Sequence, residues 1–82
     1  GMDTIDVRDV DWQQRCLEQL TSRGALTLIC PTAAAGAMAD ALSFIATNPV
    51  QTDYLSVFAR VQAVRRVGDI YQVDVDVAEA LQ

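Results

Sequence analysis

Two cysteines, a group of carboxylates and a turn of small residues are the parts of this sequence that could act on another molecule. Cys16 and Cys30 could supply a thiolate, and Asp74, Asp76 and Glu79 could offer oxygen ligands to a cation. The chain has no histidine, which removes the commonest general base, the commonest metal ligand and every Cys-His or Ser-His pair. The sequence therefore predicts a protein without enzymatic activity, cofactor or metal.

The two cysteines lie in apolar stretches and show neither Cys-x-x-Cys nor zinc-site spacing. This pattern favours buried, reduced thiols. Cys30 carries the competing hypothesis of a degenerate sulfur or thiol carrier, because it is expected at a strand end, beside a helix N-terminus that would lower its pKa. Reaction of the thiol at neutral pH without denaturant would favour the carrier.

The turn at 31–36 offers a second alternative, a small-molecule binding domain for an anion. Thr32, Ala33 and Ala34 follow a predicted strand and precede a predicted helix, where backbone N–H groups could face an anion. No Gly-x-Gly or Lys-Thr signature accompanies them. The small side chains more simply allow the helix to lie close to a sheet.

The carboxylates of Asp74 and Asp76 are expected on the wet face of a strand. Arg60 and Gln62 would face them there, which favours cross-strand pairs over a cation site. The acidic residues near the N-terminus match no calcium-loop spacing. We interpret them as solvating an edge strand and capping a helix.

Length and charge restrict the classes of partner. Eighty-two residues predict one small domain, residues 2–82, and Gly1 is interpreted as a remnant of an expression tag. So short a chain without a disulfide framework is expected to associate with a second copy. The net charge of −5 and the absence of lysine exclude nucleic acid as an expected partner. Reduced thiols and an acidic start favour the cytoplasm.

The segment 26–46 is the most apolar part of the chain and contains one charged residue, Asp40. Pro31 divides it into a strand-sized piece and an amphipathic piece, whereas a membrane span needs about 20 continuous apolar residues in one helix. We therefore expect this segment to fill the core and not to cross a membrane.

Periodicity places the elements that must position these residues. The pattern predicts a short strand within 4–10, a helix at 12–23 and a buried strand at 25–30. It then predicts a helix that Thr32 caps and Asn48 ends, and two long strands between 54 and 77. Asp11 is expected to cap the first helix with Gln14, and Gly24 to end it in the left-handed conformation. The fold class is α+β: a two-layer α/β sandwich in the order β-α-β-α-β-β, with two helices on one face of a mixed four-stranded sheet.

The last two strands can be aligned by their alternation. A two-residue Gly68-Asp69 turn would place Val61 opposite Asp76. Along the hairpin, this register would pair apolar residues of the core face with charged residues. We therefore predict the other register, with Val61 against Val75, Arg60 against Asp76 and an odd-length loop.

The element order resembles that of the TusA/SirA-like sulfur-carrier family over most of the chain. Asp6 matches the acidic residue that leads that family's motif, whereas Trp12, Gln13 and Arg15 stand where the family has Cys, Pro and Pro. The resemblance therefore implies the fold rather than the carrier cysteine. The stretch "FARVQAVRRVGDIYQVDVDV" also resembles the last hairpin of PilZ domains, whose Arg-rich start and Asp-x-Ser-x-x-Gly stretch this chain does not contain.

The sequence favours a small cytoplasmic protein-interaction or regulatory module, homodimeric through a sheet face or edge. Phe58, Val64 and Ile70 are expected among polar residues on the side of the sheet away from the helices, and they form the predicted interface.

Overall fold

The computed structural model describes residues 3–77, so Glu79 and the ends of the predicted domain 2–82 lie outside the described residues. It confirms the α+β class, with two helices and a mixed four-stranded sheet, and adds a small two-stranded sheet. The elements in chain order are β1 (Thr4–Asp6), α1 (Trp12–Arg23), β2 (Ala25–Pro31), α2 (Ala35–Thr47), β3 (Val50–Gln51), β4 (Ser56–Val57), β5 (Arg60–Val67) and β6 (Ile70–Asp76).

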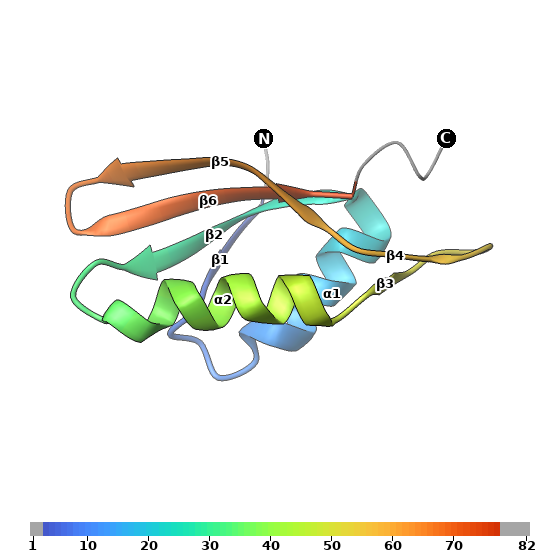
Figure 1. The fold of residues 1–82 in the computed structure, drawn as a ribbon, viewed down its shortest axis with the longest axis horizontal. Helices are drawn as coiled ribbons and strands as arrows, with labels where there is room; N and C mark the ends of the chain where they lie inside the picture. The colour runs from blue at the N-terminus through green and yellow to red at the C-terminus, as the bar shows by residue number, and fades with distance from the viewer. Residues whose placement is uncertain (1–2, 78–82) are drawn as a thin grey trace.

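The main sheet has the strand order β1-β2-β6-β5, and both helices lie on one side of it (Figure 1). β1 runs parallel to β2, and α1 provides the crossover that a parallel pair requires. β6 is antiparallel to both of its neighbours. β3 and β4 form an arm that projects beyond one end of the sheet (Figure 1). Within residues 3–77, no helix has the length and apolar character that a membrane crossing would need.

Helix α1 has the predicted bounds because its signals are local. Cys16 and Leu20, four residues apart, are its buried positions, and Gly24 ends it with a φ of 79° while its N–H donates to the Leu20 carbonyl. The predicted cap is wrong. Asp11 makes no side-chain capping bond, and the side chain of Gln14 instead donates to Glu18.

The segment 26–46 folds at its proline into two pieces that pack together, as expected. Leu26, Leu28 and Cys30 on β2 are fully buried, and Ala41 and Ile45 on α2 join the same core. These side chains can close-pack because both helices lie against β2, which is an internal strand of the sheet. The core is completed by Ile5, Cys16, Leu20, Val50, Val57, Val73, Val75 and Val77.

The start of α2 differs from the prediction, whereas its end agrees. The helix begins at Ala35 and Thr32 does not cap it, because the N–H and hydroxyl of Thr32 both donate to the carbonyl of Asp69, at 2.9 and 3.1 Å. At the other end, the backbone N–H of Asn48 donates to the Phe44 carbonyl at 3.0 Å. Asn48 therefore ends the helix through a local contact, as predicted, whereas Thr32 is engaged by a residue of the distant β5–β6 hairpin.

The pairing of β5 with β6 combines two registers. Arg60 lies opposite Asp76 and Val61 opposite Val75, as predicted, but a bulge between Val61 and Ala63 shifts the rest of the strand. The hairpin then closes on the two-residue Gly68-Asp69 turn that the prediction had rejected. One extra residue in β5 thus keeps valine against valine at both ends of the bulge, which a single register could not do.

The first predicted long strand is also interrupted. Residues from 54 onward were expected to form one continuous strand, but the structure has the two-residue β4 and then β5 from Arg60. Leu55 consequently lies in the turn of the β3–β4 arm instead of on a buried strand face, and is 47% exposed.

Candidate interaction surface

Exposed apolar side chains gather in one short part of the chain. Among the described residues, seven large apolar side chains are exposed, and six of them lie between residues 54 and 67. We call these six the exposed strip: Tyr54, Leu55, Phe58, Val61, Val64 and Val67. The seventh is Val10, in the loop before α1. The strip is continuous in sequence but uses both faces of β5, because Val61 and Val64 pair with buried valines on the helix side and Val67 pairs with Ile70 on the other side. Exposed apolar side chains concentrated in one part of a protein surface are typical of a contact site.

The β3–β4 arm presents the first part of the exposed strip. Its turn is closed by Thr52, whose N–H donates to the Leu55 carbonyl at 2.9 Å and whose hydroxyl oxygen accepts from the Leu55 N–H at 3.1 Å. Ser56 and Gln51 are joined by a further side-chain hydrogen bond of 3.0 Å. These bonds satisfy the turn internally, so Tyr54, at 94% exposed, projects from the tip.

Strand β5 presents the second part. Val61 and Val64 lie opposite Val75 and Val73, which are 1% and 0% exposed, yet they are themselves 41% and 48% exposed. Both helices pack on β2, and the helix layer leaves β5 uncovered. Because β5 is also an edge strand of the main sheet, it is accessible on both faces and along one side.

The predicted interface residues do not share one surface. Phe58 and Val64 are exposed, as expected. Val64 pairs with the buried Val73 and therefore points to the helix side, whereas Ile70 pairs with Val67 and Pro31 and points to the opposite side. The bulge causes the difference, because residues after it change the face to which their parity had assigned them.

The outer face of the β5–β6 hairpin carries paired charges. Arg60 Nε lies 3.0 Å from Asp76 Oδ1, and Arg65 Nη1 lies 2.6 Å from Asp74 Oδ2. The hydroxyl of the buried Thr27 also donates to Asp74, at 2.8 Å. Hydrogen bonds from Arg65 and then from Thr27 lower the pKa of Asp74 below 3.8.

Cross-strand pairing of these carboxylates was expected and is confirmed. The partner of Asp74 differs, however, because Gln62 donates to Asp76 and the bulge brings Arg65 to Asp74. Local charge on this part of the chain is balanced. Between residues 54 and 77, three arginines are matched by three aspartates, so the net charge of −5 comes from the rest of the sequence.

Cys30, the residue of the thiol-carrier hypothesis, lies in an environment that does not favour reaction. The side chain is 0% exposed, opposite Tyr71 on β6. Burial, followed by the charge of Asp6, raises the pKa of the Cys30 thiol above its ordinary value of 9.0, contrary to the expected lowering. Burial alone raises the pKa of Cys16 to about 11. Neither environment favours the thiolate.

Backbone N–H groups of the predicted anion-binding turn form hydrogen bonds within the protein. The Thr32 N–H donates to Asp69, and the Ala34 N–H donates to the Pro31 carbonyl at 3.4 Å. Two of the three N–H groups expected to face an anion, those of Thr32 and Ala34 but not Ala33, are therefore engaged within the chain. Thr32 thereby joins the turn to the β5–β6 hairpin, whereas Ala33 and Ala34 are exposed.

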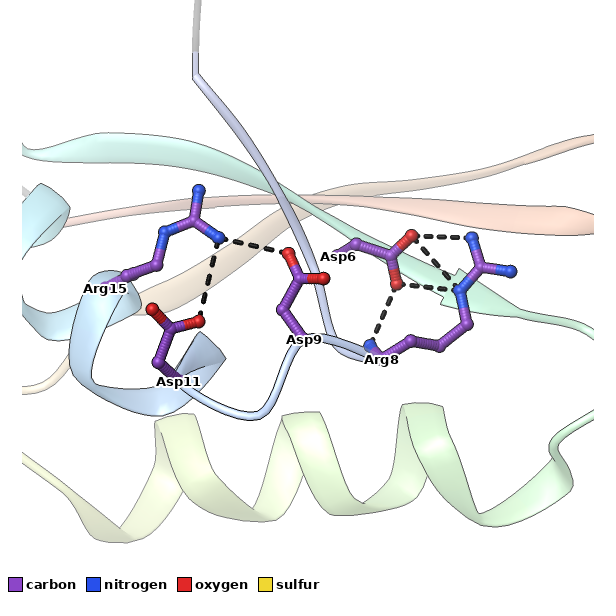
Figure 2. Close-up of polar contacts among 5 residues, drawn as sticks. All are labelled: Asp6, Arg8, Asp9, Asp11 and Arg15. Atoms are coloured by element: carbon purple, nitrogen blue, oxygen red, sulfur yellow. Dashed lines mark hydrogen bonds and ion pairs between the residues drawn. The ribbon is translucent and has the colours of Figure 1, made fainter.

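Three of the acidic residues near the N-terminus, Asp6, Asp9 and Asp11, pair with arginines (Figure 2). Arg8 Nη2 lies 2.6 Å from Asp6 Oδ2, and Arg15 Nη1 lies 3.1 Å from Asp9 and 3.9 Å from Asp11. The side-chain hydrogen bond from Arg8 lowers the pKa of Asp6 below 3.8. Within residues 3–77, no three His, Cys, Asp or Glu side chains are grouped to hold a metal ion.

An open groove of about 560 Å³ lies between α1 and α2. The rings of Trp12 and Phe44 meet in it edge to face, with centroids 5.1 Å apart. Its lining is mainly polar and includes one carboxylate, that of Asp40. The other lining residues are Val7, Gln13, Ala37, Ser43, Thr47 and Asn48.

Comparison of the chain with protein-family models, with curated proteins and with solved structures finds no match. The resemblances to the sulfur-carrier family and to the PilZ hairpin therefore stay predictions.

Sequence reasoning missed the part of the exposed strip that the arm carries. The alternation from residue 54 onward predicts one continuous strand, and therefore no turn that would expose Tyr54 and Leu55. The signal that could have located the turn is Thr52-Asp53, since a threonine hydroxyl can close a short turn by bonding the backbone beyond it.

Proposed function

We propose that this protein is a non-catalytic interaction module that associates with a second copy of itself through the exposed strip. The observation that carries the proposal is the concentration of six of seven exposed large apolar side chains in residues 54–67. Removing such surface from water is the main driving force of protein association. A domain of this size also gains stability when a partner covers surface that its own core cannot.

The balanced charge of residues 54–77 supports a second copy as the partner. Two identical molecules with a net charge of −5 repel each other at long range, but contact through this region brings neutral surfaces together. The apolar contribution is modest. Half-exposed side chains of this kind would contribute roughly 1 kcal/mol each on burial, and association itself costs at least about 4 kcal/mol. We therefore infer a weak, concentration-dependent dimer.

The two cysteines support a reducing compartment such as the cytoplasm. Both are buried and unbridged, and structural disulfides are uncommon where glutathione keeps thiols reduced.

Sedimentation velocity over a concentration series, up to about 1 mM, tests the proposal. A double variant, Leu55→Gln with Phe58→Gln, should weaken self-association at least about tenfold, because it removes apolar area from both ends of the arm. Val10→Gln is the control, since Val10 is also an exposed large apolar residue, at 103%, but lies outside the exposed strip. A wild-type protein that stays monomeric over the whole series contradicts the proposal, as does an equal effect of both changes.

A further inference from the structure

We propose that the two copies associate by pairing β5 with β5 in antiparallel fashion, around a two-fold axis at Val64, so that one sheet runs through both subunits. This inference rests on the proposed function and adds its geometry. The exposed strip supplies apolar contacts, whereas the pairing of two edge strands supplies backbone hydrogen bonds and a defined register.

β5 is the edge strand suited to this contact. It has eight residues, against three in β1 at the other edge, and no described strand or helix covers its outer side. Edge strands are commonly protected by charged side chains. Here two of the arginines on β5, Arg60 and Arg65, are turned toward Asp76 and Asp74 on the neighbouring strand, so they do not guard the open side.

The hairpin turn determines which backbone groups face outward. Gly68 has a φ of 62° and no other residue of the turn has a positive φ, which is typical of a two-residue type II′ turn. Val67 and Ile70 close that turn and therefore form a hydrogen-bonded pair. Because such pairs alternate along an antiparallel ladder, the N–H and C=O groups of Val64 and Arg66 are expected to point to the open edge.

Charge selects one register from those that this alternation allows. An axis at Arg65 or at Arg66 would set that arginine against its own copy, and like charges directly opposite are destabilising. An axis at Val64 avoids both clashes. It places Val64 against Val64 of the partner subunit and Arg65 against Ala63 of the partner subunit.

Cysteine cross-linking tests this register directly. In the proposed dimer, the Cα atoms at position 64 would be about 5.5 Å apart, within the range that a disulfide spans. Val67→Cys is the matched control, because Val67 is 51% exposed against 48% for Val64, but its two copies would be about 20 Å apart. Mild oxidation should link the Val64→Cys protein at least about tenfold faster, while the buried native cysteines contribute little background.

A proline substitution tests the backbone contact separately. Val64→Pro removes an N–H that is expected to face the open edge, and should abolish association with the β5–β6 pairing intact. Val64→Thr is its control, because it keeps the N–H and the branched side chain. Equal weakening by both would overturn strand pairing, as would a Val64→Pro protein that still dimerises.

The outcomes separate this inference from the proposed function. If the arm variants weaken the dimer but Val64→Cys links no faster than Val67→Cys, the strip is a contact surface without sheet continuation, and this inference fails alone. If the wild-type protein never associates, both fail. The cross-linking comparison remains decisive even if the proline variant does not fold.

Discussion

Two apolar segments of this protein have opposite fates. Residues 26–46 supply five of the buried core side chains and none of the exposed large apolar ones. Residues 54–67 supply one buried side chain, Val57, and six exposed ones. Both segments contain strands rich in valine, leucine or isoleucine, so composition alone does not distinguish them.

The difference comes from the layer that faces each strand. β2 is internal to the sheet and has both helices against it, so each of its apolar side chains on that face meets a partner. β5 is at the edge, where the helix layer has ended. A valine is buried only when something else covers it, and the two helices are wide enough to cover part of a four-stranded sheet.

Replacement of one leucine in each segment should give the largest contrast. Leu28→Ala is expected to lower the free energy of unfolding by about 2–5 kcal/mol, because Leu28 is fully buried and a cavity would remain. Leu55→Ala should change it by no more than about 0.5 kcal/mol at a concentration where the protein is monomeric. Urea denaturation of both variants measures the difference, and similar losses would contradict the contrast.

Thiol labelling compares the same segments without removing a side chain from the core. At pH 8, the native Cys30 should react at least about a hundredfold more slowly than a cysteine placed by Val64→Cys, because reaction of Cys30 requires the core to open. Burial also keeps the pKa of Cys30 above 9.0, so little thiolate is present. Rapid labelling of Cys30 in the wild-type protein would instead revive the thiol-carrier hypothesis.

The smallest expected effect concerns the charged pair beside the exposed strip. Hydrogen bonds from Arg65 and Thr27 lower the pKa of Asp74 in the folded protein below 3.8. The ionised carboxylate therefore stabilises the fold fully at pH values above 3.8, and this stabilisation is lost as the pH falls through the folded pKa. Asp74→Asn should lower stability by about 1 kcal/mol at pH 7, with a difference from wild type that shrinks below pH 4.

Denaturation midpoints at pH 7 and at pH 3 would measure this change. Asp40→Asn is the control, because Asp40 is exposed and forms no ion pair within residues 3–77. A difference between Asp74→Asn and wild type that is independent of pH would show that the carboxylate charge is not the source of the stabilisation.

Most short-range signals were predicted well, although the capping bond expected of Asp11 does not form. The bounds of α1, the left-handed Gly24 and the end of α2 at Asn48 each depend on residues within one or two helical turns. Burial of the segment 26–46 was predicted for the same reason, since the proline that divides it lies within the segment itself.

Of the predictions that depended on distant partners, the pairing of Arg60 with Asp76 was confirmed but two others failed. Thr32 resembled a helix cap, but its hydrogen-bonding groups are occupied by Asp69, which is thirty-seven residues away. The hairpin register was predicted from parity, and the bulge changed the parity partway along β5. Consequently Val64 and Ile70, which the sequence assigned to one surface, lie on opposite faces.

The sequence by itself determined the two helices, the buried strand between them, the fold class and the presence of a core around residues 26–46, because hydrophobic periodicity and terminating residues act locally. Only the tertiary structure decided which apolar segment remains exposed, since that depends on where the helix layer ends over the sheet. The same is true of the bulge, which arises when two strands must match their valines on one face while a two-residue turn joins them.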